Sequence, residues 1–169
     1  MAIAVPAWTA GLSVSRATLD PQDGHYVLNA DFDLKLSDAL EDALIRGVVL
    51  NFVLEAHIWQ PRWWWFNKEI ADVKYARKLS FNSLTRQYRL SSDTDYQNFS
   101  SLDDAQYALS RVQNLSLVKA SELSKESFYR ASVSMWLDVS QLPKPFQVKA
   151  VTSKDWNLVA DDYVFDVAL

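Results

Sequence analysis

The sequence contains no cysteine, three glycines and two histidines in 169 residues. Without cysteine, disulfides, thiolate metal sites and cysteine nucleophiles are all excluded. Three glycines are too few for the usual glycine-rich loop that binds phosphate. No apolar run reaches the roughly 18 residues that cross a bilayer as a helix. The lack of cysteine leaves the compartment open, because such a chain tolerates oxidising and reducing surroundings alike.

The composition is that of a globular protein, with 49% hydrophobic and 22% charged residues, and the length is that of one ordinary domain. The net charge of −4 argues against a general nucleic-acid binder, so no nucleic-acid partner is expected. The charge is uneven, however, since residues 61–90 carry 7 basic and 2 acidic residues. The ordinary interpretation of such a basic stretch is a solvated face of a sheet.

The start of the chain reads Met1-Ala-Ile-Ala-Val-Pro-Ala7 and shows no basic segment followed by an apolar stretch. We expect residues 1–10 to be an unstructured start, or the remnant after a removed signal peptide. Residues 11–169 show no linker and no internal repeat. They are therefore predicted to form a single β-sandwich domain.

Period-two alternation of apolar and polar residues dominates the sequence and predicts strands. It predicts strands over residues 12–19, 26–36, 48–59, 71–81, 84–90, 115–118, 129–139, 146–151 and 163–167. Two segments instead have helical spacing behind a capping serine or aspartate, near residues 37–47 and 101–112. The predicted fold is mainly β, an antiparallel β-sandwich of about eight strands with two short helices in the connections.

Candidates for chemistry are few. Glu55 and His57 lie two residues apart on one face of a predicted strand, but the sequence identifies no third ligand. No serine stands in a Gly-x-Ser-x-Gly motif. We therefore expect no catalytic residue, no metal site and no cofactor.

The stretch Pro61-Arg-Trp-Trp-Trp-Phe-Asn67 is the most unusual feature of the sequence. If it is extended, Trp63 and Trp65 share one face and Trp64 takes the other. Tryptophan is usually placed for packing, so at least one face is predicted to close the end of the core. The other face would be an exposed aromatic surface beside cations. The predicted partner- or ligand-binding residues are Trp59, Arg62, Trp63, Trp64, Trp65 and Lys68.

Several segments, taken in order, resemble one bacterial family, and they span residues 12–166. They are Phe52-Val-Leu-Glu-Ala56, Pro61-Arg-Trp-Trp-Trp-Phe66, Leu84-Thr-Arg-Gln-Tyr-Arg-Leu90, Leu137-Asp-Val-Ser-Gln-Leu-Pro-Lys-Pro-Phe-Gln147 and Asp155-Trp156. The sequence is similar to the domain-of-unknown-function 4390 proteins, found mainly in proteobacteria. The resemblance implies an N-terminal export signal and a periplasmic or envelope location. It also implies genes beside a nitrogen-regulation-type sensor kinase, and it supplies no catalytic residue.

Two functions remain. The first is a non-enzymatic interaction or accessory module of the envelope, linked to an envelope or membrane protein such as the sensor kinase. The alternative is a small-ligand or glycan-binding sandwich with a concave site lined by Trp59, Trp63 or Trp65. The sequence leaves the ligand, the partner and the oligomeric state open.

Overall fold

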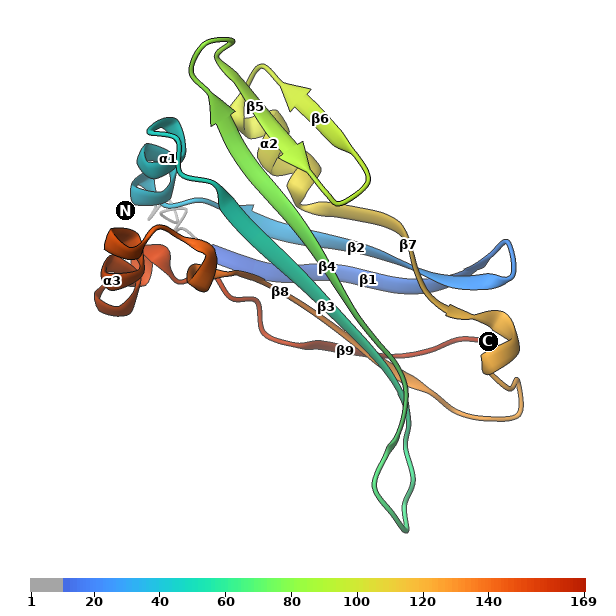
Figure 1. The fold of residues 1–169 in the computed structure, drawn as a ribbon. Coiled ribbons are helices and arrows are strands. Elements are labelled where there is room, and N and C mark those ends of the chain that lie inside the picture. Colours follow the sequence, from blue (N-terminus) through green and yellow to red (C-terminus); the bar gives the residue numbers. More distant parts are fainter. Residues whose placement is uncertain (1–10) are drawn as a thin grey trace, which may run out of the picture.

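Two antiparallel sheets form an open, sandwich-like arrangement in the computed structural model, which describes residues 11–169 (Figure 1). The predicted antiparallel, mainly β sandwich is confirmed, with nine strands in the described residues instead of about eight. The segment 1–10, predicted to be an unstructured start or a signal-peptide remnant, lies outside the described residues.

The smaller sheet has the order β1-β2-β7, with bounds β1 Gly11–Gln22, β2 His25–Lys35 and β7 Arg111–Lys119. The turn between β1 and β2 is formed by Asp23 and Gly24, whose φ angles are 50° and 77°. Two successive positive φ values are typical of the tight turns that join twisted antiparallel strands.

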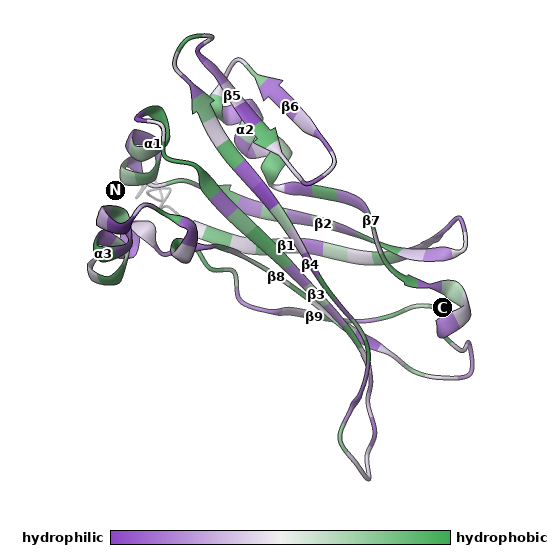
Figure 2. Cartoon of the chain, viewed as in Figure 1, coloured by the Kyte–Doolittle hydropathy of each residue, from purple (hydrophilic) through white to green (hydrophobic). Residues whose placement is uncertain are grey.

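The larger sheet has the order β6-β5-β4-β3-β8-β9. Its bounds are β3 Leu50–Gln60, β4 Lys68–Asn82, β5 Gln87–Ser91, β6 Tyr96–Phe99, β8 Arg130–Leu137 and β9 Tyr163–Asp166. β3 is a central strand, because Leu54 pairs with Tyr75 of β4 and with Met135 of β8. Every second residue of β3 is buried up to Ile58, and these buried residues are the apolar ones in the alternation of hydropathy along this strand in Figure 2.

In residues 11–169, three α-helices and three short 3₁₀ turns fill the connections. They are α1 Asp38–Ile45, α2 Leu102–Leu109, α3 Lys144–Thr152, and the turns Ala120–Glu122, Val139–Gln141 and Lys154–Trp156. The hydroxyls of Ser37 and Ser101 accept backbone N–H bonds and cap α1 and α2, as their sequences predict. None of the described helices combines the length and the apolar character needed to cross a bilayer.

One predicted strand is wrong, because residues 146–151 lie in α3. Pro143 and Pro145 stand at the start of α3. Proline suits the first turn of a helix, where its missing N–H is not needed and its φ is already helical. Phe146 and Ala150 then pack on the core, four residues apart, while Val148 and Val151 are exposed.

The segment 101–112 was also predicted as one helix, but α2 ends at Leu109. Val112, three residues beyond, continues the apolar stripe of that helix and so looked helical. It instead pairs with Ala30 of β2, because β7 begins at Arg111. Strand pairing thus overrides helical spacing here. Pairing with β5 also makes Tyr96–Phe99 a strand, β6, although the polar sequence after residue 91 does not indicate one.

Candidate functional site: an aromatic hairpin tip

The loop between β3 and β4 carries the tryptophan run. Gln60 pairs with Lys68 at its base, and residues 61–67 form the loop. β8 pairs with β3 only as far as Trp59, which lies opposite Arg130. Beyond Trp59, no strand of the described residues pairs with the free edge of β3. In Figure 1 the hairpin protrudes from the rest of the molecule. We call residues 61–68 the aromatic tip.

All the aromatic side chains of the tip are exposed to solvent. The exposed fractions are 92% for Trp63, 65% for Trp64, 69% for Trp65 and 82% for Phe66. The rings form two edge-to-face pairs, with centroid distances of 5.4 Å between Trp63 and Trp64 and 5.8 Å between Trp65 and Phe66. Such pairs add a small local stabilisation, but they leave most of the ring surface in water.

The prediction that one face of the run closes the core is therefore wrong. It assumed an extended strand with the body of the sandwich on one side. The run is a loop instead, and it lies past the last pair between β3 and β8. Among the described residues, no sheet or helix packs against either side of this loop. Alternate side chains of the run therefore have no core to face, and none of its rings is buried.

A β-bulge lies directly below the tip. Ile58 pairs with Ala71 and Trp59 pairs with Glu69, which leaves Ile70 as an extra residue on β4. A bulge bends its strand and increases the local twist. The aromatic tip is therefore joined to the sheet through a bend, and the direction of its projection is fixed by β3 and β4.

The tip is cationic as well as aromatic. Residues 61–68 contain Arg62 and Lys68 and no acidic residue. Arg62 is half-buried and Lys68 is exposed, and neither forms an ion pair with another residue in the range 11–169. Their charges remain available to an anionic partner.

Trp59 is separate from the other predicted site residues. It is half-buried on the outer face of β3, beside a shallow cavity of about 280 Å³. That cavity is also lined by His57, Asn67, Glu69 and Ser132. The structure thus brings Arg62, Trp63, Trp64, Trp65 and Lys68 together at the tip and places Trp59 at its base.

Sequence reasoning missed the third member of a charged cluster on the same outer face. Asp72 lies opposite His57 in the ladder between β3 and β4, and register is not visible in sequence spacing. The Nε2 atom of His57 is 3.6 Å from the Oε1 atom of Glu55, and its Nδ1 atom is 3.6 Å from the Oδ1 atom of Asp72.

Charge balance decides how this cluster is interpreted. The Nζ atom of Lys74 lies 3.4 Å from the Oε1 atom of Glu55 and already neutralises it. Glu55, His57 and Asp72 each place one possible ligand atom within 4.8 Å of the others, but the two carboxylates face different ring nitrogens of His57 and Glu55 is already paired with Lys74. The cluster therefore fits a surface charge network better than a metal centre.

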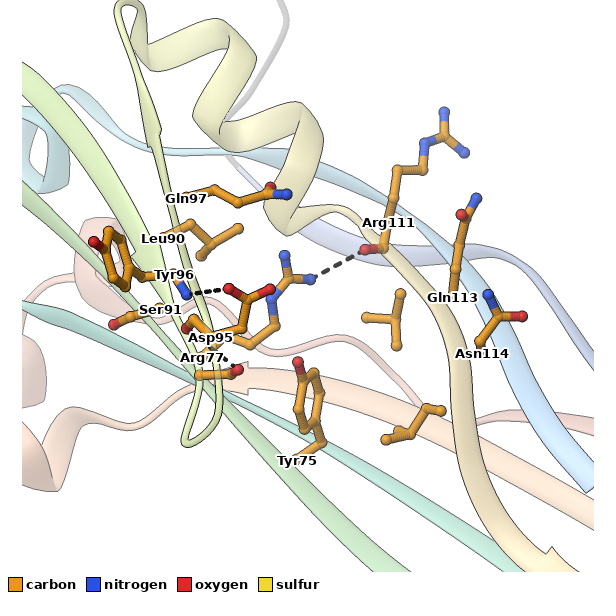
Figure 3. Close-up of a pocket in the computed structure, with 13 residues that line it drawn as sticks. Tyr75, Arg77, Leu90, Ser91, Asp95, Tyr96, Gln97, Arg111, Gln113 and Asn114 are labelled. Carbon is orange, nitrogen blue, oxygen red and sulfur yellow. Dashed lines mark hydrogen bonds between the residues drawn. The ribbon is translucent and has the colours of Figure 1, made fainter. Parts of the chain in front are cut away.

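A second cavity, of about 300 Å³, lies between β4, β5 and β7 (Figure 3). Tyr75 and Arg77 of β4 project into this region. The guanidinium of Arg77 donates to the carbonyl oxygens of Ala108 at 2.8 Å, Leu109 at 3.3 Å and Arg111 at 3.1 Å. A cation at the C-terminus of α2 donates to carbonyl oxygens that the helix leaves unpaired. It also interacts favourably with the negative end of the helix dipole.

Burial lowers the pKa of Arg77 from its ordinary value, and the electrostatic influence of Tyr75 acts in the opposite direction. Three of the guanidinium donors are already bonded to the backbone around the end of α2. This side chain joins the helix to the larger sheet, so we assign it a structural role. The aromatic tip remains the stronger candidate for a binding site.

Comparison with known proteins supports the family resemblance. The family model described as Domain of unknown function (DUF4390) matches residues 9–166, nearly the whole chain, including both sheets and the tip. No curated protein and no solved structure matches.

Proposed function

The chain belongs to the DUF4390 family of domains of unknown function, and from its geometry we propose that it is a non-enzymatic interaction module of the bacterial envelope. The aromatic tip is the docking element, and the sandwich is the scaffold that holds it. In this proposal the partner is a component of the envelope membrane. The sensor kinase implied by the family resemblance belongs to that class.

The exposure of four consecutive aromatic side chains carries the proposal. An aromatic side chain buries about 150–250 Å² when covered, so the exposed fractions of residues 63–66 correspond to roughly 600 Å² of aromatic surface. That equals the upper end of the largest apolar patch on a typical monomer, about 300–600 Å². Such patches on stable proteins usually mark surfaces that another molecule covers.

The envelope location rests on the resemblance, which implies export. The lack of cysteine is compatible with that location but does not select it, because such a chain tolerates oxidising and reducing surroundings alike. Fractionation of cells that carry a C-terminal tag on the product of the native gene tests this part. Recovery only with cytoplasmic proteins would contradict it.

Co-sedimentation of the purified protein with isolated cell envelopes tests the docking role. The triple tip variant Trp63→Ser, Trp64→Ser, Trp65→Ser is expected to lose most of the binding of the wild type. The matched control is Leu84→Ser, which removes a 93% exposed apolar side chain from the hairpin loop at the other end of β4. Equal sedimentation of the wild type and the triple tip variant, with unchanged unfolding curves, would refute the proposal.

A glycan-binding role is the alternative, and the cavity beside Trp59 favours it. An indole flanked by His57, Asn67 and Glu69 combines a stacking surface with hydrogen-bonding groups. Titration with peptidoglycan fragments, followed by tryptophan fluorescence, distinguishes this role. A change in emission that disappears in Trp59→Ala and persists in the triple tip variant would favour the glycan site.

A further inference from the structure

We propose that the occupant of the aromatic tip is the surface of an anionic lipid bilayer, into which the tip inserts at headgroup depth. This inference rests on the proposed function, because it specifies the partner of the same docking element. It is carried by the side-chain types, the shape and the charge of residues 61–68.

The side chains of the tip are those that prefer the interface between water and lipid. Tryptophan is enriched at membrane surfaces, where its apolar ring and its polar N–H meet different surroundings. The tip has three tryptophans and one phenylalanine in succession, and it contains no aliphatic leucine, isoleucine or valine. This composition is typical of shallow insertion at the interface.

The shape of the tip also fits a fluid surface. A protein partner usually receives anchor residues in pockets on one side. Here Trp63, Trp64, Trp65 and Phe66 are each at least 65% exposed, so the rings are accessible around the loop. A bilayer can surround a protrusion on every side, whereas a rigid pocket must match it.

The hairpin is long enough to pass through the headgroup layer of one leaflet. From Trp59, the last residue paired with β8, to Trp64 the chain spans at most about 16 Å. The polar headgroup layer of one leaflet is about 5–8 Å thick. The rings can therefore reach the boundary with the acyl chains while the sheet stays outside.

Charge separates the tip from the body. The tip carries a net charge of +2 from Arg62 and Lys68, and the rest of the chain carries −6, the difference from the total of −4. An anionic membrane attracts the first and repels the second. Because electrostatic effects fade over about 8–10 Å at physiological salt, a projecting tip keeps the acidic body at a weakly repelled distance.

Binding to protein-free vesicles tests the inference. Vesicles of phosphatidylcholine alone are compared with vesicles of equal parts phosphatidylcholine and phosphatidylglycerol, using flotation and the shift of tryptophan emission. We expect binding with a blue shift, stronger on the anionic vesicles. The triple tip variant should bind about a hundredfold less. Arg62→Gln and Lys68→Gln should each lose about fivefold, on anionic vesicles only.

The control Leu84→Ser should bind like the wild type. If the wild type binds envelopes in a tip-dependent manner but binds neither kind of vesicle, the partner is a protein or a glycan; the inference then fails while the proposed function stands. If the triple tip variant retains both vesicle and envelope binding, both fail. Matching urea midpoints for all variants establish that a lost signal reflects binding and not unfolding.

Discussion

Two aromatic clusters of this protein have similar ring contacts and opposite surroundings. At the tip, the ring centroids of Trp63 and Trp64 lie 5.4 Å apart, and Trp63 is 92% exposed. Near α3, the ring centroids of Trp156 and Phe146 lie 5.2 Å apart, and Trp156 is 5% exposed. A ring contact therefore does not show whether an aromatic pair belongs to a core. What decides is whether the backbone around it supplies other elements to cover the rings.

The segment around Trp156 is fixed from several directions. The hydroxyl of Ser37 donates to the carbonyl oxygen of Asp155 at 2.6 Å, which joins the segment to α1. The backbone N–H of Leu137 donates to the carbonyl oxygen of Leu158, and that of Ala160 to the carbonyl oxygen of Met135. Within the described part of the chain, the tip is held only by the two strands that lead into it, β3 and β4.

Truncation of the buried tryptophan should break this comparison most strongly. Trp156→Ala removes a ring from the core and leaves a cavity, so we expect a loss of about 3–5 kcal/mol in the free energy of unfolding. Trp64→Ala should change that free energy by less than about 0.5 kcal/mol, because its ring is already in water. Urea unfolding followed by circular dichroism measures both. Similar losses would contradict the assignment of the tip as uncovered.

The same contrast applies to two arginines. Arg77→Met leaves the carbonyl oxygens at the end of α2 without their donors, and should cost about 3 kcal/mol. Arg62→Met removes a cation with no ion pair in residues 11–169 and should be nearly neutral for stability. Hydrogen exchange of the α2 amides should rise in the first variant only. Unchanged protection of α2 would show that Arg77 does not hold it.

The two helix caps provide a smaller test. Ser101→Ala removes one bond, to the backbone N–H of Asp104, and should cost about 1 kcal/mol. Ser37→Ala removes the bond from the N–H of Leu40 and also the bond to Asp155, so about 2 kcal/mol is expected. Thermal unfolding ranks the two variants. Equal losses would mean that the second bond of Ser37 adds nothing.

Fluorescence quenching should show the smallest effect. Iodide is an anion and should quench the indoles beside Arg62 more than an uncharged quencher of equal access does. The ratio of iodide quenching to quenching by the uncharged compound should fall by about twofold or less in Arg62→Gln. It should also fall as the salt concentration increases. A ratio that does not respond to this substitution would place Arg62 away from the exposed rings.

Much of the fold follows from the sequence, because period-two alternation is a local signal. It predicts β3 within two residues at each end, and the serine caps of α1 and α2 form as the sequence indicates. The failures involve non-local causes. Val112 fits a helical stripe but is drawn into β7 by its pairing with Ala30.

The composition of the sequence singles out the candidate site, but it does not predict the surroundings of that site. Residues 62–65 attract attention because three tryptophans in a row are rare, whereas their exposure depends on where β8 stops pairing with β3, which only the register of the sheet shows. Asp72 was missed for the same reason, since its proximity to His57 depends on strand pairing.

The position of β3 has a consequence for how the chain folds. Its partner β4 follows directly, but its other partner β8 comes much later, with Leu54 and Met135 separated by 81 positions. Closing so large a loop is entropically costly and slows folding. Until residue 137 is available, the aromatic hairpin can form while one edge of β3 still lacks its hydrogen-bonding neighbour. In that state the unpaired edge of β3 exposes backbone N–H and C=O groups, which is the kind of edge that can pair with another chain.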